Sequence, residues 1–207
     1  TVISNISSQQ DNLDILPNDV KLVDLPILRP VNVKGDIKAL ILLLKYFYSE
    51  KFSIVYSLTP KGGLLSMIAA RVTCVPIRIH TFTGQVWATR KGINQFLLKL
   101  MDRITATLAT IVIVDSPSQR EFLINNNVVK NSKSLVLGDG SISGVDPKRF
   151  YPNPLVRKMV REEMGLNDST IVFLFVGRLK KEKGLFELAK AFSAICNNNN
   201  NIKLWII

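Results

Sequence analysis

The sequence predicts an α/β fold: a doubly wound, mostly parallel sheet followed by the start of a second domain of the same kind. Short apolar runs of strand length alternate with longer segments of helical period along the whole chain. The apolar runs are continuous, as in SIVYSL at 53–58, which is typical of parallel strands that are buried on both faces. A chain of 207 residues, 47% of them hydrophobic, can bury one large core or two small ones.

The first part of the chain holds most of the predicted elements. Strands are expected at 1–4, 20–25, 53–58, 76–82, 110–114 and 134–138, with a polar loop between the first two that has no helical period. Helices are expected at 36–48, at 64–72, at 93–108 and after Ser116, where Pro117 and Gln119 complete a capping box. Strands that alternate with helices in this way predict parallel pairing.

The second part begins near Phe150. An irregular loop, GDGSISGVDPKRF, and a linker with two prolines, YPNPL, separate it from the first part, so we predict two domains at 1–150 and 151–207. A helix at 155–164, a strand at 171–176, a helix at 185–195 and a strand at 202–207 follow. Because the chain opens and closes on strands, we expect a missing first βα unit, a truncated second domain and self-association through open strand edges.

The loop GRLKKEKG at 177–184 is the strongest candidate for a binding site. Arg178 and Lys183 follow a predicted parallel strand and precede a helix, the position where open α/β sheets bind ligands. Arg178 can offer a fork of donors to two phosphate oxygens, Lys183 adds a mobile charge, and Gly177 permits a tight turn. The loop therefore predicts a phosphate site, although a solvated basic surface has the same composition.

The turn TPKGG at 59–63 is a second candidate for an anion site. Lys61, Gly62 and Gly63 precede a predicted helix N-terminus, where backbone N–H groups attract negative charge. Two glycines are equally typical of a tight turn between a strand and a helix, so both interpretations stand.

The strand at 76–82 and the loop TGQVWATRKG after it contain His80, the only histidine, and Trp87. We expect the strand to bring His80 to its carboxyl end as a candidate catalytic base, although a lone histidine is also typical of a core position. Trp87 lies beside Arg90 and is expected to be exposed, where its ring would stack on a sugar or enter a membrane interface.

The segment 93–108 has a clear helical period. Its apolar residues are Ile93, Phe96, Leu97, Leu100, Met101, Ile104 and Leu108, and we expect this stripe to face the core. Lys99 and Arg103 lie along one flank of the stripe. Together with Arg90 and Lys91 they could lie against anionic lipid.

Positive charge is concentrated in one segment of a chain whose formal net charge is +11. Residues 61–110 contain seven Lys and Arg residues and a single acidic residue, Asp102. Such a segment suggests nucleic acid, an anionic membrane or a pyrophosphate as the partner, or a surface that only confers solubility. The two cysteines are far apart in sequence, which favours reduced thiols and the cytoplasm.

Three runs of sequence resemble family-4 retaining glycosyltransferases. FVGRLKKEKGLFELAKAF looks like the start of their donor-binding domain, and SIVYSLTPKGGLLSMIAARVTCVPIRIHTFTGQVWATRKG looks like the acceptor-side domain of the branch that builds capsular and other lipid-linked polysaccharides. LGDGSISGVDPKRF resembles the segment between the two domains. The resemblance implies a GT-B fold, in which two Rossmann-like domains face each other.

The resemblance also implies a reaction and a setting. A sugar would pass, with retention, from a nucleotide-sugar such as a UDP-sugar to a lipid-linked saccharide at the inner face of the cell membrane, without a metal or other cofactor. Gly177, Arg178 and Lys183 would hold the donor diphosphate, and the two cations would stabilise its charge as it leaves. The acceptor side would comprise Lys61, Gly62, Gly63, Thr83, Gly84, Gln85, Trp87 and Arg90.

The chain departs from the family pattern in two places. Many members have a T-x-H-G pattern after the fourth strand, whereas this chain has Thr83 before Gly84 and its histidine three positions earlier, so His80 is the nearest candidate for that role. The family's paired glutamates, separated by seven residues, are expected downstream of Ile207. We therefore expect this chain by itself to bind donor weakly and to turn over negligibly.

Two functions of other classes compete with sugar transfer. One is a basic module that binds nucleic acid or an anionic membrane without chemistry, and the other is a non-catalytic regulator of a complete transferase. The chain has no helix-turn-helix, zinc-finger spacing or RNP-like strand, which argues against nucleic acid. Arg178 and Lys183 argue against a regulator that lacks a donor site.

Overall fold

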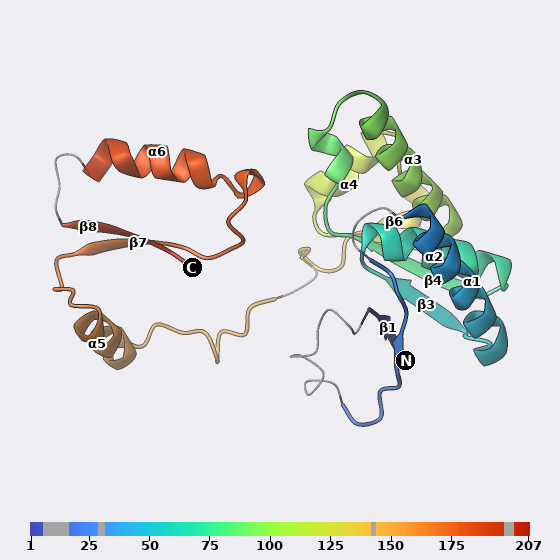
Figure 1. Ribbon diagram of the computed structural model, residues 1–207, viewed down its shortest axis with the longest axis horizontal. Helices are drawn as coiled ribbons and strands as arrows, with labels where there is room; N and C mark the ends of the chain where they lie inside the picture. Colours follow the sequence, from blue (N-terminus) through green and yellow to red (C-terminus); the bar gives the residue numbers. More distant parts are fainter. Residues whose placement is uncertain (6–16, 29–31, 142–143, 197–200) are drawn as a thin grey trace. The chain divides into compact units, whose positions relative to one another are not determined.

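The chain folds into two compact units, Thr1–Gly144 and Val145–Ile207. The computed structural model describes residues 1–5, 17–28, 32–141, 144–196 and 201–207 (Figure 1). Each unit contains parallel strands connected by helices, so the predicted parallel α/β fold is confirmed. The division falls between Gly144 and Val145, whereas we predicted a boundary near Phe150.

The first unit is built on a four-stranded parallel sheet in the order β3-β4-β5-β6. The strands span Ile54–Ser57, Ile77–Phe82, Ile111–Val114 and Ser134–Leu135, in agreement with the predicted runs. A separate parallel pair consists of β1 (Val2–Ser4) and β2 (Leu22–Asp24). Most of the polar loop expected between these two strands lies outside the described residues.

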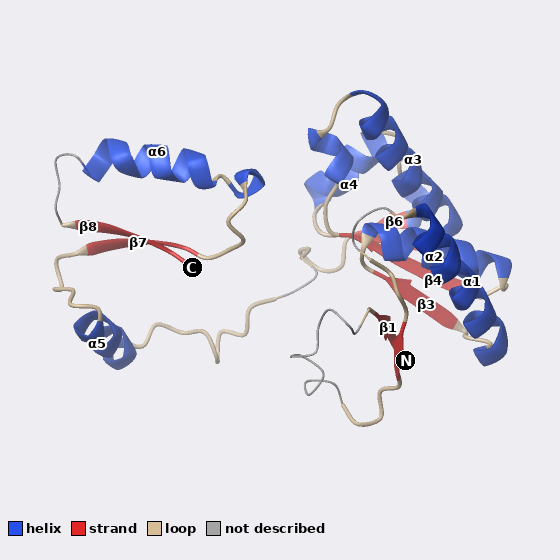
Figure 2. Ribbon diagram, in the orientation of Figure 1, coloured by secondary structure: helices blue, strands red, loops and turns tan. Residues whose placement is uncertain are grey.

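Among the described residues of this unit, four α-helices accompany the strands, namely α1 (Val33–Glu50), α2 (Pro60–Val72), α3 (Gly92–Leu108) and α4 (Pro117–Asn125). Helix α2 packs against both α1 and α3, and these helices lie together beside the sheet (Figure 2). The predicted capping box of α4 is confirmed, since Ser116 Oγ accepts from the Gln119 backbone at 3.1 Å and Gln119 Oε1 accepts from the Asp115 backbone at 2.7 Å.

The order of the strands explains why one face of the sheet is covered. Successive parallel strands joined by right-handed crossovers place all the connecting helices on the same face. That face carries buried side chains such as Val55, Val112 and Val114, which join the hydrophobic core with residues of the helices. On the opposite face, Ile54 and Tyr56 of β3 are more than half exposed.

Helix α3 buries the side opposite to the one that we predicted. Its buried residues are Asp102, Thr105 and Ala106, and most of its predicted core stripe is exposed, namely Ile93, Phe96, Leu97, Leu100 and Ile104. The prediction that this stripe faces the core is therefore wrong. The helical period identified the apolar side of the helix correctly, but a period does not say which side a helix turns toward its neighbours.

The second unit is smaller. Helix α5 (Pro154–Glu163) precedes the parallel pair β7 (Ile171–Phe175) and β8 (Ile202–Ile206), which α6 (Leu185–Cys196) connects. The buried Arg161 of α5 donates to the Thr170 carbonyl at 2.6 Å and so ties α5 to the residue before β7. Among the helices that the structure describes in the two units, none is both long enough and apolar enough to cross a membrane.

Two cations hold the carboxyl end of α3. Lys133 Nζ donates to the carbonyls of Thr107 and Ala109, each at 2.9 Å, and Arg78 Nε donates to the Leu108 carbonyl at 2.7 Å. The last carbonyls of a helix have no partner within the helix, and they also carry its negative partial charge. Burial lowers the pKa of Lys133 from its ordinary value, with the nearby charges of Lys130 and Arg78 as smaller contributions.

The Lys133→Met substitution is expected to lower the free energy of unfolding by about 1–3 kcal/mol, because two carbonyls lose a charged hydrogen-bond donor. Urea denaturation of the purified chain measures this change. Lys130→Met is the matched control, since Lys130 is an exposed lysine three positions away, and its substitution should alter stability by less than about 0.5 kcal/mol. Equal losses in the two variants would contradict a role for Lys133 as a helix cap.

Candidate functional site

The candidate site of the first unit lies where the parallel strands end. The turns that follow β3, β4 and β5 meet at the carboxyl edge of the sheet, because parallel strands all end on the same side. These turns contain most of the predicted acceptor residues. The structure therefore brings the regions of Lys61 and Thr83 to one edge, as the sequence suggested.

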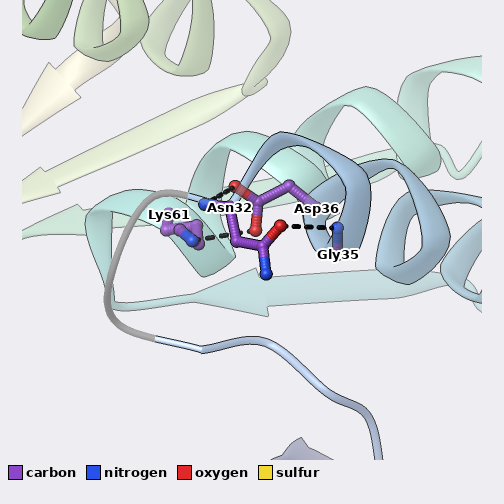
Figure 3. Close-up of polar contacts among 4 residues, drawn as sticks. All are labelled: Asn32, Gly35, Asp36 and Lys61. Carbon is purple, nitrogen blue, oxygen red and sulfur yellow. Dashed lines mark hydrogen bonds and ion pairs between the residues drawn. The ribbon is translucent and has the colours of Figure 1, made fainter.

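Lys61 is part of an ion pair rather than a free loop residue. Its Nζ lies 2.8 Å from Asp36 Oδ1, and both side chains are largely buried (Figure 3). The other carboxylate oxygen of Asp36 accepts from the Asn32 backbone at 3.2 Å, and Asn32 Oδ1 accepts from the Gly35 backbone at 3.1 Å (Figure 3). This cluster ties the N-terminus of α1 to that of α2. The charge of Lys61 is thus already matched, so an external anion would have to compete with Asp36.

Gly62 and Gly63 lie inside the first turn of α2 rather than in a loop, because the helix begins at Pro60 with Thr59 as its N-cap. A Cβ atom at Gly63 would lie 2.7 Å from His80 Nδ1 and nearer still to Cε1. A Cβ atom at Gly62 would lie 2.6 Å from Thr59 Oγ1. Gly63 therefore allows the first turn of α2 to pack closely on β4, and Gly62 leaves room for the N-cap residue Thr59, which favours the structural interpretation of both glycines.

His80 lies in the core beneath that turn. It is two residues short of the end of β4, only 1% of its surface is exposed, and its Nδ1 lies 2.8 Å from Ser57 Oγ. Its ring also contacts Phe82 edge to face, and burial lowers its pKa to about 4. The expectation that His80 reaches the carboxyl end of its strand is wrong, because β4 continues to Phe82 and α2 covers the imidazole.

The loop after β4 divides into exposed and buried parts. Thr83, Gly84 and Arg90 are exposed, so these three predicted acceptor residues are available for contact. Gln85 is partly buried, and its Nε2 atom has no hydrogen-bond partner among the described residues. The short helix η3 (Val86–Thr89) then leads into α3.

Trp87 is buried, which corrects the prediction that it is exposed. Its side chain is 2% exposed, and its Nε1 donates to Asp102 Oδ2 at 2.9 Å. The ring stacks on Phe122 of α4, with centroids 5.3 Å apart, and Lys99 Nζ lies 5.1 Å from the ring centre. Trp87 therefore anchors the loop to α3 and α4, and in this arrangement its ring does not reach a sugar or a bilayer.

Asp102 is the buried partner in this anchor. Burial raises its pKa to about 6, against a smaller lowering effect of the hydrogen bond from Trp87. The sequence placed Asp102 only as the one acidic residue in a basic segment. No sequence signal predicted its burial, because Asp102 lies on the opposite side of the helix from the apolar stripe that we expected to face the core.

Asp115 is a further residue at this edge, directly after β5, and no sequence signal marked it as part of a site. Its carbonyl accepts from the Ser141 backbone at 2.7 Å, and the same oxygen would clash with a Cβ atom at Gly140. Its carboxylate Oδ1 is buried and without a hydrogen-bond partner in the described part of the chain. The loop after β6 thus packs directly on the end of β5.

The candidate phosphate loop of the second unit connects β7 to α6. Arg178 follows Gly177, whose backbone N–H donates to the Ile207 carbonyl at 3.0 Å, and Lys183 closes the short helix η5 (Lys181–Lys183). Gly184 caps that helix in the left-handed conformation, with φ of 74°. Arg178 and Lys183 are exposed, and neither forms an ion pair with the side chains that the structure describes. Both cations are therefore available to a ligand.

A metal site and a cavity are two other kinds of site at which a ligand could bind. Within the described ranges, no group of three or more His, Cys, Asp or Glu side chains could hold a metal ion. A cavity of about 620 Å³ lies between α4 and β6, and Arg120 and Ser134 are among its lining residues. None of the predicted site residues lines it.

The contact between Gly63 and His80 gives a stability prediction. Ala is normally better than Gly inside a helix by about 1 kcal/mol, but here we expect Gly63→Ala to destabilise the unit by about 1–3 kcal/mol because its Cβ meets the imidazole. The loss should largely vanish in a His80→Ala background, which leaves space for the methyl group. Urea denaturation of the four proteins of this double-mutant cycle measures the coupling, and additive losses would contradict the contact.

Asp102 gives a pH prediction. The folded state favours the protonated carboxyl, so the free energy of unfolding should be highest below the ordinary pKa of 3.8 and should fall as the pH rises to about 6, by about 3 kcal/mol in total. Asp102→Asn keeps an acceptor for Trp87 and removes this loss, so the variant should be more stable than the wild type near neutral pH.

Unfolding curves between about pH 4 and pH 8 measure the difference between the two proteins. Burial of His80 contributes a trend of opposite sign, since its lowered pKa makes stability rise from about pH 4 to its ordinary pKa of 6.5. This trend is common to both proteins and cancels in the difference. Asp139→Asn, at an exposed aspartate, is the control, and a flat difference for Asp102→Asn would refute the burial cost.

Comparison with known proteins identifies relatives along the whole chain. Residues 156–207 match the family Glycosyl transferases group 1. The capsular polysaccharide biosynthesis glycosyltransferase CapM of Staphylococcus aureus is 36% identical over 202 residues, which are 98% of this chain and 52% of that protein. The UDP-Gal:alpha-D-GlcNAc-diphosphoundecaprenol alpha-1,3-galactosyltransferase of Escherichia coli is 30% identical over 188 residues, 90% of this chain and 48% of that enzyme. The chain thus spans about half the length of these relatives.

Solved structures share the fold at low sequence identity. Anabaena Alr3699/HepE in complex with UDP-glucose superimposes with a TM-score of 0.65 at 14% identity, covering 89% of this chain and 46% of that one. The UDP-GlcNAc 2-epimerase of Methanocaldococcus jannaschii gives a TM-score of 0.56 at 14% identity, covering 93% and 53%. Taken with the sequence relatives, these similarities confirm the resemblance seen in the sequence: the chain carries part of a group 1 glycosyltransferase domain at residues 156–207, and its parallel α/β units resemble those of proteins with the GT-B fold.

Proposed function

We propose that the protein carrying this sequence transfers a sugar from a nucleotide-diphosphate sugar to a lipid-linked saccharide during surface polysaccharide biosynthesis. The two relatives support this proposal, since one is described as a capsular polysaccharide glycosyltransferase and the other as a galactosyltransferase that acts on a diphosphoundecaprenol-linked sugar. Structural neighbours with bound UDP or UDP-glucose support a uridine nucleotide as the donor.

The observation that carries the proposal is the pair of exposed cations after β7. In the reaction, the bond from the anomeric carbon to the phosphate oxygen breaks and a bond from the acceptor oxygen forms, while the hydroxyl proton passes to the departing diphosphate. Negative charge builds up on that diphosphate, and donors already in place stabilise it most effectively. Arg178 and Lys183 are two such donors beside the start of α6, so the proposal needs no metal ion.

The first unit would bind the acceptor. Thr83, Gly84 and Arg90 are the exposed members of the predicted acceptor set, and Trp87 would act by holding their loop in place. Lys61 would contribute through its tie to Asp36, and a catalytic role for His80 would require α2 to move away. We place the protein at the inner surface of the cell membrane, where a lipid-linked acceptor would be found.

Nucleic-acid binding is the weaker alternative. Of the seven cations in residues 61–110, three have internal partners: Lys61 with Asp36, Arg78 with the end of α3, and Lys99 with Asn126 at 3.0 Å. The four that remain, Arg71, Arg90, Lys91 and Arg103, are exposed, and they are divided between α2, the two residues before α3, and α3 itself. A surface of this kind offers little to a phosphate backbone, which binds best to an uninterrupted basic groove.

A transfer assay tests the proposal directly. The protein carrying this sequence is incubated with radiolabelled UDP-galactose, UDP-glucose or UDP-N-acetylglucosamine and with undecaprenyl-diphosphate-linked N-acetylglucosamine. Label in the lipid extract, with the anomeric configuration of the donor retained in the product, is the expected result. Release of free sugar alone, or no label in lipid with any donor, would refute transfer to a lipid-linked acceptor.

Substitutions at the two cations test the donor site. Arg178→Ala and Lys183→Ala are each expected to weaken UDP binding at least about tenfold, because each removes a charged contact worth about 1.5–3 kcal/mol. Isothermal titration with UDP measures the loss. Lys190→Ala changes an exposed lysine of α6 and is the matched control, which should bind UDP as the wild type does. Unaltered binding in the Arg178 and Lys183 variants would remove these residues from the site.

A further inference from the structure

Helix α3 presents an apolar band to the outside of its unit. We call this band, made of Ile93, Phe96, Leu97, Leu100 and Ile104, the α3 stripe; its members are between 38% and 68% exposed. They stand at positions i, i+3, i+4, i+7 and i+11, so they form one continuous band along the helix. A contiguous exposed band of large apolar side chains marks an interaction surface.

The opposite side of α3 explains why the stripe stays outside. Asp102 and Ala106 are buried there, and the Asp102 carboxylate accepts the indole N–H of Trp87. Turning the helix to bury the stripe would break this bond and carry Asp102 away from its partner. The stripe is therefore the stable outer side of the helix.

The exposed charges on α3 and in the two residues before it are all positive. Arg90 and Lys91 precede its first residue, and Arg103 lies along its edge, all three exposed. The one acidic residue between positions 58 and 114 is Asp102, which is buried. An apolar face bordered by cations is typical of helices that lie in the surface of an anionic bilayer.

We infer that the α3 stripe is a membrane docking surface, which enters the interface of an anionic bilayer while Arg90, Lys91 and Arg103 contact lipid phosphates. A helix of 17 residues is about 25 Å long and would lie parallel to the surface. A second copy of the chain fits this surface less well, because two positive surfaces would repel each other. The inference adds a specific surface to the proposed function, on which it rests for its biological setting.

Vesicle flotation tests the inference without donor or acceptor sugar. The protein should float with vesicles of phosphatidylglycerol and phosphatidylcholine in equal parts, and much less with pure phosphatidylcholine. Phe96→Ser/Leu97→Ser should lower the partition coefficient at least about tenfold, because two apolar side chains no longer enter the bilayer. Arg90→Gln/Lys91→Gln/Arg103→Gln should lower it about tenfold or more at low salt on the anionic vesicles only.

Helix α1 supplies matched controls. Ile37 and Ile41 are 54% and 47% exposed, close to the 61% and 49% of Phe96 and Leu97, and Lys34, Lys38 and Lys45 are exposed lysines on the same helix. Ile37→Ser/Ile41→Ser and Lys34→Gln/Lys38→Gln/Lys45→Gln should bind vesicles as the wild type does. All these positions are exposed, so circular dichroism should show unchanged folding in every variant.

Three results would overturn the inference: equal losses in the α1 and α3 variants, equal binding to neutral and anionic vesicles, or self-association without lipid that Phe96→Ser/Leu97→Ser abolishes. The last result would assign the stripe to a second copy of the chain. A protein that floats through α3 but transfers no sugar would refute only the proposed function, whereas sugar transfer without flotation would refute only the docking surface.

Discussion

The sequential order of the parallel strands is the constraint on which the first unit depends, because crossovers between parallel strands are almost always right-handed. They place the connecting helices on one face of the sheet and all the strand-to-helix turns at one edge. The first consequence is a single core between the sheet and its helices, with Met67, Val112 and Leu123 among its fully buried members. The second is that residues far apart in sequence, such as Lys61, Thr83 and Asp115, share one edge without any local signal that would link them.

Much of the fold could be predicted from the sequence because buried parallel strands require continuous runs of apolar residues. The runs around Val55, Ile79 and Val112 are continuous and apolar, and each became a strand close to its expected position. The start of α2 was misplaced because glycines suggested a turn, whereas Thr59 and Pro60 already form a helix start. At Gly63 the missing side chain makes room for His80, a partner that only the tertiary structure reveals.

The candidate site was less predictable, because the roles of polar residues depend on distant partners. Lys61 finds Asp36 across 25 positions of sequence, and Trp87 finds Asp102 on the next helix. A sequence pattern shows that a cation or an indole is present, but whether it serves a ligand or a neighbour depends on these contacts. Arg178 and Lys183 differ from Lys61 and Trp87, because their position after a strand could be predicted from the local sequence alone. Both are exposed after β7, as that local pattern predicted.

The bond between Trp87 and Asp102 connects the two surfaces to which we assign functions. It fixes η3 against α3, and η3 directly follows the exposed residues Thr83 and Gly84 of the proposed acceptor loop. The stacking of Trp87 on Phe122 extends the same anchor to α4. These contacts connect the proposed acceptor loop to the α3 stripe, so a bilayer that bound α3 would also limit the height of the loop above it. A lipid-linked acceptor would have its diphosphate at the same interface, so this connection would set how far along the saccharide the reaction takes place.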